Sequence, residues 1–477
     1  MTAAVPLCVD LDGTLVRVDL LHEGLLQAVK RGPSEVLGLL GALTKGKAPF
    51  KHKVAALCAV DASSLPYRAE VIALIEEARA AGRPVILCTA SPAPFARSVA
   101  EHLGLFDQVV TSTPDLNLAT HAKADALAQS YGENGFDYIG NCDHDLAVFA
   151  RARSGILVCS QPHLRARARA VQPNMIFIDD PRPPAKAWIK AFRVHQWVKN
   201  LLVFVPLAAG HAMGDPQRLL NAILAFMAFC FCASALYICN DLLDLNADRA
   251  HHSKRRRPFA AGTISVKAAL AAVAGLLFLA LMLALLLPWR FGAILLGYAF
   301  ITTAYSVRLK QQVVVDVLLL AGLYTIRIIA GAAATVITPS FWLLGFSMFI
   351  FLCLAMVKRV SELQRTTGGG QLAGRGYVQE DRIVLIALGA SSGMVAVLIL
   401  ALYMQSDTML RMYPAGGWLW LVPPLVLYWI TRLWLKTNRN EIEDDPVVFA
   451  IRDWQSLALL GLIGTIFLLA TFGPALW

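Results

Sequence analysis

The feature that most constrains this chain is a series of long apolar stretches that begins near Trp197 and continues to the C-terminus. A helix needs about 20 apolar residues to cross the roughly 30 Å hydrocarbon layer of a bilayer. The stretches that approach or exceed this length are 196–212, 218–239, 267–287, 291–306, 312–335, 341–357, 383–404, 417–432 and 456–474. This part of the chain is therefore predicted to be an all-α membrane domain of nine transmembrane helices.

Residues 1–160 have a different pattern, typical of a soluble α/β domain. Short apolar segments alternate with helical stretches, which predicts a parallel sheet with helical crossovers. The predicted strands are Val5–Val9, Val85–Cys88, Gln108–Thr111, Tyr138–Gly140 and Gly155–Val158. Residues 161–185 are rich in Arg, Pro and Ala and are interpreted as a linker, which places the membrane domain at 186–477.

The net charge of +10 comes from basic residues that concentrate in alternate loops between the predicted spans. Cytoplasmic loops are enriched in Lys and Arg, so the loops near residues 249–267, 308–310, 358–382 and 436–452 are predicted to be cytoplasmic. The N-terminus has no basic region followed by an apolar one, so no signal peptide is expected. These patterns predict a multi-pass protein of the inner (plasma) membrane with a cytoplasmic N-terminal domain. They also explain the charge without a nucleic-acid partner.

Three aspartates follow the second apolar stretch, in the sequence Asn240-Asp241-Leu-Leu-Asp244-Leu-Asn-Ala-Asp248. On a helix, positions i, i+3 and i+7 lie on one face, and stacked carboxylates repel one another unless a cation such as Mg²⁺ binds them. Lys254 and the arginines at 255–257 follow closely. Carboxylates for a metal beside cations for phosphate suit a pyrophosphate-bearing substrate. The alternative is a solvated loop with an ordinary run of charges.

This pattern, with Arg257-Pro258 after it, resembles the first signature of the UbiA superfamily of intramembrane prenyltransferases. The resemblance covers roughly residues 186–477. It implies nine transmembrane helices around a central cavity that opens to membrane lipids, and Mg²⁺ as the cofactor.

Four further stretches resemble, within that superfamily, the decaprenyl-phosphate phosphoribosyltransferases: 193–200, 304–310, 358–363 and 374–377. This resemblance implies transfer of 5-phosphoribosyl from phosphoribosyl pyrophosphate to a polyprenyl (decaprenyl) phosphate, a step of cell-wall biosynthesis. The superfamily usually has a second Asp-rich motif, but here it retains only Asp316, with Leu320 four residues later. That departure favours an acceptor lipid with a single phosphate.

The expected metal ligands are Asp241, Asp244 and Asp248, supported by Asn240; the metal would neutralise the departing pyrophosphate. Phosphate groups are expected to contact Lys199, Lys254, Arg257 and Lys310.

Two further residues have two interpretations each. Arg327 lies within an apolar stretch, where a charge is costly and usually functional, and is expected either to pair with Asp316 or to hold the lipid phosphate. Tyr305 is either a phosphate donor or an interfacial anchor.

Near the N-terminus, Val9-Asp10-Leu11-Asp12-Gly13-Thr14-Leu15 resembles the first signature of haloacid dehalogenase-like phosphatases. The resemblance implies that Asp10 is the nucleophile, that Asp12 is the general acid and base, and that both contact Mg²⁺. Thr89 is expected to bind a phosphate oxygen and Lys123 to neutralise charge. The insertion between Leu15 and Val85 is predicted to form a small helical cap.

The last motif of that family usually reads Gly-Asp, whereas this chain has Gly140-Asn141, with Asp143 and Asp145 following. Asn141 and Asp145 are the expected metal ligands, with Asp143 or Asp145 compensating for the lost charge. The alternatives are an active phosphatase, acting on the lipid-linked product, and a degenerate regulatory domain.

Two other functions are consistent with parts of the sequence. The first is a prenyltransferase that moves a prenyl chain from its diphosphate to an aromatic or quinone acceptor. The second is a transporter or scaffold, which has no need of three stacked aspartates beside a basic loop. The reduced second acidic motif favours the phosphoribosyltransferase.

Overall fold

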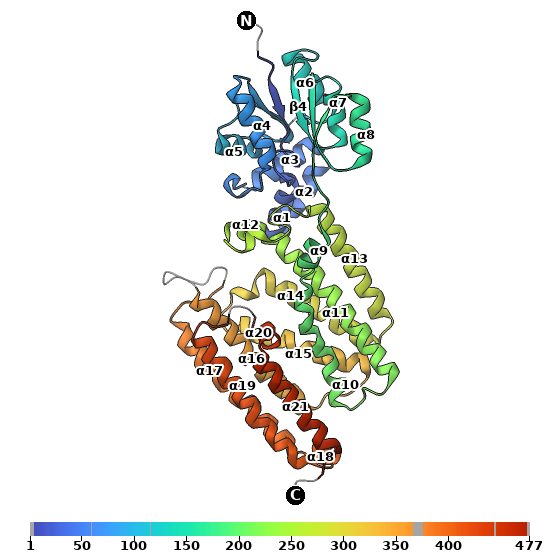
Figure 1. The fold of residues 1–477 in the computed structure, drawn as a ribbon, viewed down its shortest axis with the longest axis vertical. Coiled ribbons are helices and arrows are strands. Elements are labelled where there is room, and N and C mark those ends of the chain that lie inside the picture. The colour runs from blue at the N-terminus through green and yellow to red at the C-terminus, as the bar shows by residue number, and fades with distance from the viewer. Residues whose placement is uncertain (1–3, 59, 115, 366–374, 443–444, 475–477) are drawn as a thin grey trace. The chain divides into compact units, whose positions relative to one another are not determined.

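The computed structural model describes residues 4–58, 60–114, 116–365, 375–442 and 445–474 (Figure 1). The chain divides into two compact units, Met1–Phe192 with Tyr237–Ala274, and Arg193–Leu236 with Gly275–Trp477. The segment with the three aspartates therefore belongs to the first unit, together with the soluble domain. The expected residue Gly374 lies outside the described residues.

The first unit contains a six-stranded, fully parallel sheet in the order β3-β2-β1-β4-β5-β6. The strands are β1 (Leu7–Val9), β2 (Val85–Pro92), β3 (Gln108–Ser112), β4 (Asp137–Gly140), β5 (Ser154–Val158) and β6 (Ile176–Ile178). The predicted parallel α/β fold is confirmed. Because β1 lies between β2 and β4, the residues that follow these three strands meet at one edge of the sheet.

The sheet extends beyond residue 160, into the stretch that the sequence suggested was a linker. Residues 161–185 contain α8 (Pro162–Val171) and β6, and β6 pairs with β5. A strand of three residues is shorter than the usual five or so, so it leaves no alternating pattern that a sequence could show.

Each face of the sheet has its own core, because successive strand residues point to opposite sides. Val9 and Leu87 pack with α4 (Ala69–Ala80) and α5 (Ala93–Leu103). Cys8 and Ile86 pack on the other face. The helices of that face are α6 (His121–Tyr131), α7 (Leu146–Phe149) and α8.

A small helical cap is inserted between Leu15 and Val85, as predicted. It consists of α1 (Leu20–Arg31), α2 (Pro33–Leu43) and α3 (Lys47–Leu57), which pack on one another, followed by η1 (Ala62–Ser64). The remaining short elements of this unit are η2 (Asp143–Asp145), α9 (Ala185–Ala191), α12 (Leu245–Ala250) and η4 (Lys254–Arg256).

Eight helical segments among the described residues are long and apolar enough to cross a membrane. They are α11 (Pro216–Leu243), α13 (Val266–Leu285), α14 (Trp289–Val307), α15 (Val315–Thr335), α16 (Phe341–Gln364), α17 (Asp381–Met404), η6 with α19 (Gly416–Asn438) and α21 (Trp454–Phe472). Shorter elements between them are η5 (Leu309–Gln311), α18 (Asp407–Met412) and α20 (Pro446–Arg452). Figure 1 shows α16, α17, α19 and α21 packed side by side. The chain is thus a multi-pass membrane protein.

The first of the nine predicted spans, 196–212, is not a continuous α-helix. It forms a 3₁₀-helix, η3 (Val194–Phe204), and then α10 (Val205–Ala209), with Pro206 in the first turn of α10. Proline has no amide hydrogen to donate, so it is tolerated where a new helix begins. A 3₁₀-helix rises about 2.0 Å per residue, so the eleven residues of η3 extend over roughly 22 Å.

The η3 segment packs closely on α15. A Cβ atom added to Gly331 of α15 would overlap the backbone carbonyl of Val203. Glycine is therefore required where these two backbones meet.

Candidate active site

Two of the three motif aspartates converge on a single nitrogen atom. Nη1 of Arg257 lies 3.0 Å from Oδ1 of Asp241 and 2.6 Å from Oδ2 of Asp248. Both aspartates are buried, while the Arg257 side chain is 27% exposed. The structure therefore brings together two of the three expected metal ligands, Asp241 and Asp248, with Arg257, the expected phosphate contact.

Asp244 points elsewhere, which corrects the expectation that all three aspartates share one face of a continuous helix. Helix α11 ends at Leu243, and Asp244 has φ −102° and ψ 13°, which interrupts the helix before α12 begins. The carboxylate of Asp244 accepts a hydrogen bond from Lys30 of the cap, at 2.9 Å.

The oxygen atoms of Asp241 and Asp248 suit a magnesium ion, because Mg²⁺ is commonly held by one or two carboxylates, substrate phosphates and water. Within the described residues, no group of three or more His, Cys, Asp and Glu side chains is placed to hold a metal. A metal here would therefore be bound by two carboxylates of this chain and completed by substrate oxygens.

Three further expected residues lie on three different elements. Asn240 precedes Asp241 on α11, and its carbonyl accepts the amide of Asp244 at 3.0 Å. Lys254 is exposed on η4. Lys310 lies in η5 of the second unit.

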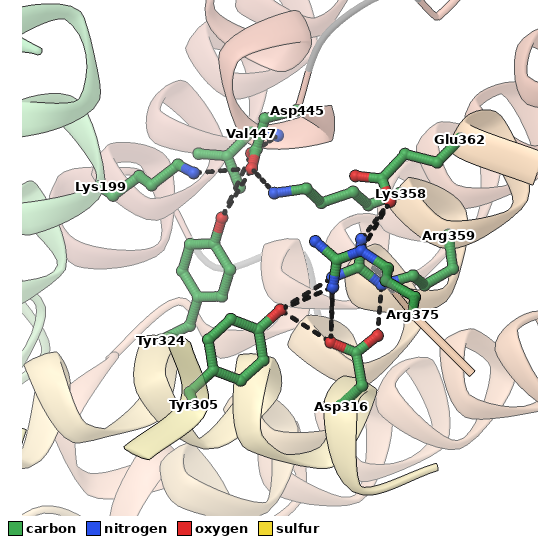
Figure 2. Close-up of polar contacts among 10 residues, drawn as sticks. All are labelled: Lys199, Tyr305, Asp316, Tyr324, Lys358, Arg359, Glu362, Arg375, Asp445 and Val447. Carbon is green, nitrogen blue, oxygen red and sulfur yellow. Dashed lines mark hydrogen bonds and ion pairs between the residues drawn. The ribbon is translucent and has the colours of Figure 1, made fainter. Parts of the chain in front are cut away.

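In the second unit, Asp316 is enclosed by two arginines (Figure 2). Arg359 of α16 pairs with both carboxylate oxygens, and Nη1 of Arg375 lies 3.0 Å from Oδ1. The hydroxyl of Tyr305 donates to the same oxygen at 2.7 Å. Glu362 pairs with both arginines and completes this group, here termed the Asp316 cluster.

Asp316, the one aspartate retained from the second acidic motif, is already paired with two arginines. Asp316 and Arg359 have 0% exposed side chains, whereas Arg375 is 19% exposed. An aspartate held by two guanidinium groups is already neutralised and has little attraction for a metal. Tyr305 is part of this network, so it is more than an interfacial anchor.

A second group, the Asp445 cluster, centres on an aspartate that the sequence analysis did not identify. Oδ2 of Asp445 accepts from Nζ of Lys199 at 2.6 Å and of Lys358 at 3.1 Å, and Tyr324 donates to Oδ1 at 3.2 Å (Figure 2). Oδ1 also accepts the amide of Val447, which caps α20. Burial alone would raise the pKa of Asp445, but the two lysines lower it well below its usual range.

The two clusters are linked because Lys358 and Arg359 are consecutive residues of α16. Together they place four cationic side chains in one region of the second unit (Figure 2). Only Lys199 of these four was singled out as a phosphate ligand. Lys358, Arg359 and Arg375 carried a signal, as basic residues in predicted cytoplasmic loops.

Arg327 does not pair with Asp316, which is one of its two expected roles. The residues are eleven positions apart on α15, roughly 16 Å along a helix. Nε of Arg327 instead donates to Asn200 at 2.9 Å and Nη2 to Tyr298 at 3.1 Å, and its guanidinium lies over the rings of Tyr298 and Tyr324.

In the soluble domain, the loop after β1 carries the expected Asp10 and Asp12. Asp10 accepts from Lys123 at 2.8 Å, and Asp12 accepts from the hydroxyl of Ser91 at 2.5 Å and the amide of Leu20 at 2.9 Å. Burial raises the pKa of Asp10 to about 6, although Lys123 opposes this, and raises the pKa of Asp12 to about 7, with a contribution from Asp19.

Of the two aspartates that follow Asn141, Asp145 is the buried one. It lies 3.5 Å from Lys123 and accepts from Tyr138 at 2.8 Å and from the amide of Asn141 at 2.9 Å. Asp143, the other candidate, is exposed and pairs with Arg167. The structure therefore brings Asp10, Lys123 and Asp145 into one buried network.

Thr89, which is expected to bind a phosphate oxygen, ends up beside Ser91. Its hydroxyl accepts the amide of Ser91 at 3.0 Å, and the hydroxyl of Ser91 faces Asp12. Ser91 is therefore a further candidate for a phosphate contact, which sequence reasoning missed because it lies two residues beyond the expected position. Gly13 has φ +75°, and a Cβ there would overlap the side chain of Asn141, so the close approach of these loops requires glycine.

Comparison with known proteins gives two family matches. Residues 201–473 match the UbiA prenyltransferase family, and residues 39–150 match haloacid dehalogenase-like hydrolases. An uncharacterized protein, y4nM of Sinorhizobium fredii, is 36% identical over 98% of this chain and 91% of its own length. Nodulation protein NoeC of Azorhizobium caulinodans is 36% identical over 60% of this chain and 94% of its own length.

The decaprenyl-phosphate phosphoribosyltransferase of Corynebacterium glutamicum is 36% identical, over 40% of this chain and 61% of the enzyme's length. A solved structure of a UbiA homologue from Archaeoglobus fulgidus, bound to DMAPP and Mg²⁺, is 18% identical, with a TM-score of 0.46, over 59% of this chain and 99% of that chain. The UbiA family model covers more than half of the chain. The chain therefore belongs to the UbiA prenyltransferase family of membrane transferases, with a haloacid dehalogenase-like domain at its N-terminus.

Proposed function

We propose that this membrane transferase moves a 5-phosphoribosyl group from phosphoribosyl pyrophosphate to a polyprenyl phosphate. The observation that carries the proposal is the Asp316 cluster. Two arginines neutralise the remnant of the second acidic motif, which leaves one carboxylate site for a diphosphate and a separate cationic region for a phosphate monoester. The partial similarity to decaprenyl-phosphate phosphoribosyltransferases supports the same substrates.

In the reaction, an oxygen of the lipid phosphate forms a bond to C1 of the ribose. The bond from C1 to the pyrophosphate oxygen breaks, and pyrophosphate leaves with the electron pair. Asp241 and Asp248 would hold Mg²⁺, which neutralises the charge of the leaving group. Arg257, already between these carboxylates, is positioned to contact the diphosphate.

The cations around Asp316 and Asp445 bind the monoester phosphates in this proposal. The side chains of Lys358 and Arg375 are 29% and 19% exposed, and the buried Lys199 shares the Asp445 carboxylate with Lys358. Hydrogen bonds from such cations to phosphate are strong and directional. Arg327 holds the rings of Tyr298 and Tyr324 and positions the wall of this region.

The soluble domain would act next, as a phosphatase that removes the 5-phosphate of the lipid-linked product. The Asp10 carboxylate attacks phosphorus while Asp12 protonates the departing alcohol; water then releases phosphate from Asp10, with Asp12 as the base. The raised pKa of Asp12 suits a general acid. Fusion to the transferase raises the local concentration of the product. The proposal places this domain in the cytoplasm.

Membranes that contain the protein are incubated with phosphoribosyl pyrophosphate labelled in the ribose and with a polyprenyl phosphate. We expect label in the lipid phase, lost in Asp241→Ala but retained in Asp10→Asn, which should instead lose phosphate release. A parallel reaction with a labelled prenyl diphosphate and an aromatic acid tests the alternative prenyl transfer. Label that enters lipid only in the parallel reaction, or in neither, would overturn the proposal.

A further inference from the structure

Helix α1 of the cap begins at the proposed phosphatase site. The amide of Leu20, its first residue, donates to Oδ1 of Asp12 at 2.9 Å. Asp19 caps the helix by accepting the amide of His22 at 3.1 Å. The position and direction of α1 are therefore fixed by the loop that carries Asp12.

The other end of α1 reaches the transferase motif, within the same compact unit. Lys30 lies ten residues after Leu20, about 15 Å along a helix. Its Nζ donates to Oδ1 of Asp244 at 2.9 Å and to the carbonyl of Leu243 at 3.1 Å. The last carbonyls of a helix have no partner within the helix, so Lys30 caps α11 at the residue where the motif bends.

A buried ion pair secures the same contact. Both oxygens of Glu23 accept from Arg249 of α12, at 2.5 and 2.7 Å, and the two side chains are only 5% and 3% exposed. Nε of Arg249 also donates to the carbonyl of Ala260, in the loop that follows Arg257. The pair therefore fixes α12 with Asp248 and the loop with Arg257 relative to each other.

The loop has a second contact with the soluble domain. Gly262, at φ +67°, lies so close to Arg17, Val18 and Pro66 that an added Cβ would be within 3.0–3.2 Å of their side chains. Arg17 and Val18 immediately precede the Asp19 cap of α1.

We propose that Glu23 and Lys30, from the cap of the soluble domain, are positioning residues for the metal site of the transferase. Neither touches the reacting atoms. Glu23 sets the separation of Asp248 and Arg257 through Arg249, and Lys30 directs Asp244. The inference rests on the proposed role of the Asp241–Asp248 motif, and it makes the soluble domain a structural part of the transferase site as well as a separate catalyst.

The test uses the full-length protein in membranes or detergent, with Glu23→Gln and Lys30→Met. Matched controls on the same domain are Glu77→Gln and Lys45→Met, which change exposed side chains. Two quantities are measured: the Mn²⁺ binding that disappears in Asp241→Ala, and the Mg²⁺ concentration that gives half-maximal transfer of labelled ribose to lipid. Thermal melting and phosphate release verify that each variant is folded.

Residues that orient metal ligands typically alter metal affinity by about 10- to 100-fold. We expect Glu23→Gln to weaken the Asp241-dependent Mn²⁺ binding and to raise the half-maximal Mg²⁺ concentration by at least about tenfold. Lys30→Met should change the Mn²⁺ binding and the half-maximal Mg²⁺ concentration in the same direction. Lys30→Arg, which keeps the positive charge, and the two control variants should keep both quantities at the wild-type values. The combined Glu23→Arg and Arg249→Glu variant recovers part of the loss if the pair itself is responsible.

Unchanged Mn²⁺ binding in folded Glu23→Gln and Lys30→Met would overturn the inference, as would a loss of total activity with no shift in metal dependence. Failure of the proposed function looks different. In that case the wild-type protein transfers no ribose to lipid, while the Mn²⁺ comparison still decides whether Glu23 and Lys30 position the motif.

Discussion

The Asp316 cluster makes a quantitative prediction about stability. Asp316 accepts four hydrogen bonds, two from Arg359 and one each from Arg375 and Tyr305. Two carboxylates, Asp316 and Glu362, balance the two guanidinium groups. Asp316→Asn leaves one excess positive charge at a site where Asp316 and Arg359 have 0% exposure.

Removal of one partner from a buried ion pair costs about 3–5 kcal/mol. Each 1.4 kcal/mol is a factor of about ten in an equilibrium constant, so the unfolding equilibrium should shift by roughly a hundredfold to several-thousandfold. The assay is denaturant unfolding of the purified protein in mixed micelles, followed by tryptophan fluorescence. Glu380→Gln, which changes an exposed carboxylate of the same unit, is the control and should stay within about 0.5 kcal/mol of the wild type.

The double variant Asp316→Asn with Arg375→Gln restores the balance of charge. We expect it to recover more than about 1 kcal/mol of the lost stability, because the remaining Arg359 keeps its partner Glu362. Ribose transfer should not recover, since Arg375 is one of the proposed phosphate-binding cations. A loss below about 1 kcal/mol in Asp316→Asn, or no recovery of stability in the double variant, would refute this account of the cluster.

Three further outcomes are expected. Gly331→Ala should destabilise the protein by about 1–3 kcal/mol in the same unfolding assay, since the new methyl group overlaps Val203. Gly322→Ala is the control on the same helix and should be neutral or stabilising, because a Cβ there meets nothing within 4 Å. Equal effects of the two substitutions would contradict the packing argument. Burial raises the pKa of Asp12 to about 7, so in EDTA the native state keeps the Asp12 proton between about pH 4, near the unfolded-state pKa, and pH 7. The free energy of unfolding should therefore fall by about 1.4 kcal/mol per pH unit over this range and then level off. Thermal melting of Asp12→Asn should lack this pH-dependent fall, and parallel pH profiles for the variant and the wild type would disprove it. Lys199→Met should raise the KM for polyprenyl phosphate by about 10- to 100-fold with a smaller change in kcat, and an unchanged KM would remove this lysine from the proposed phosphate site.

The sequence contained enough information to predict the architecture, and it singled out candidate residues for each site. Asp10 and Asp12 were singled out by a local motif at the end of a strand, and Lys123 by the resemblance to a known family. Asp241, Asp248 and Arg257 were predicted together because they lie within 17 residues of one another. Residues that are close in the sequence can be predicted to lie close in space when a single helix or the end of a strand fixes their relative positions.

The rest depended on contacts between distant parts of the chain. Asp445 follows a run of acidic residues that reads as a solvated loop, and only packing brings it to Lys199, 246 positions away. Likewise, the position of Asp244 depends on a break in the helix and on Lys30, 214 residues earlier. The periodicity of apolar residues does not predict which distant residues pair in this way. The amphipathic period also does not distinguish a 3₁₀-helix from an α-helix in a short apolar segment, so η3 was predicted as part of an ordinary span.

The 3₁₀ geometry of η3 determines which of its residues face the neighbouring helices. Residues three apart are eclipsed in such a helix, so Trp197, Asn200 and Val203 form one straight ridge. That ridge meets Ser234 through the indole of Trp197, Cys230 through Asn200, and Gly331 through the backbone of Val203. An α-helix would turn each successive member of the ridge by about 60° out of line. The 3₁₀ winding of these eleven residues therefore lets η3 pack on both α11 and α15. The same winding leaves Lys199 directed at Asp445.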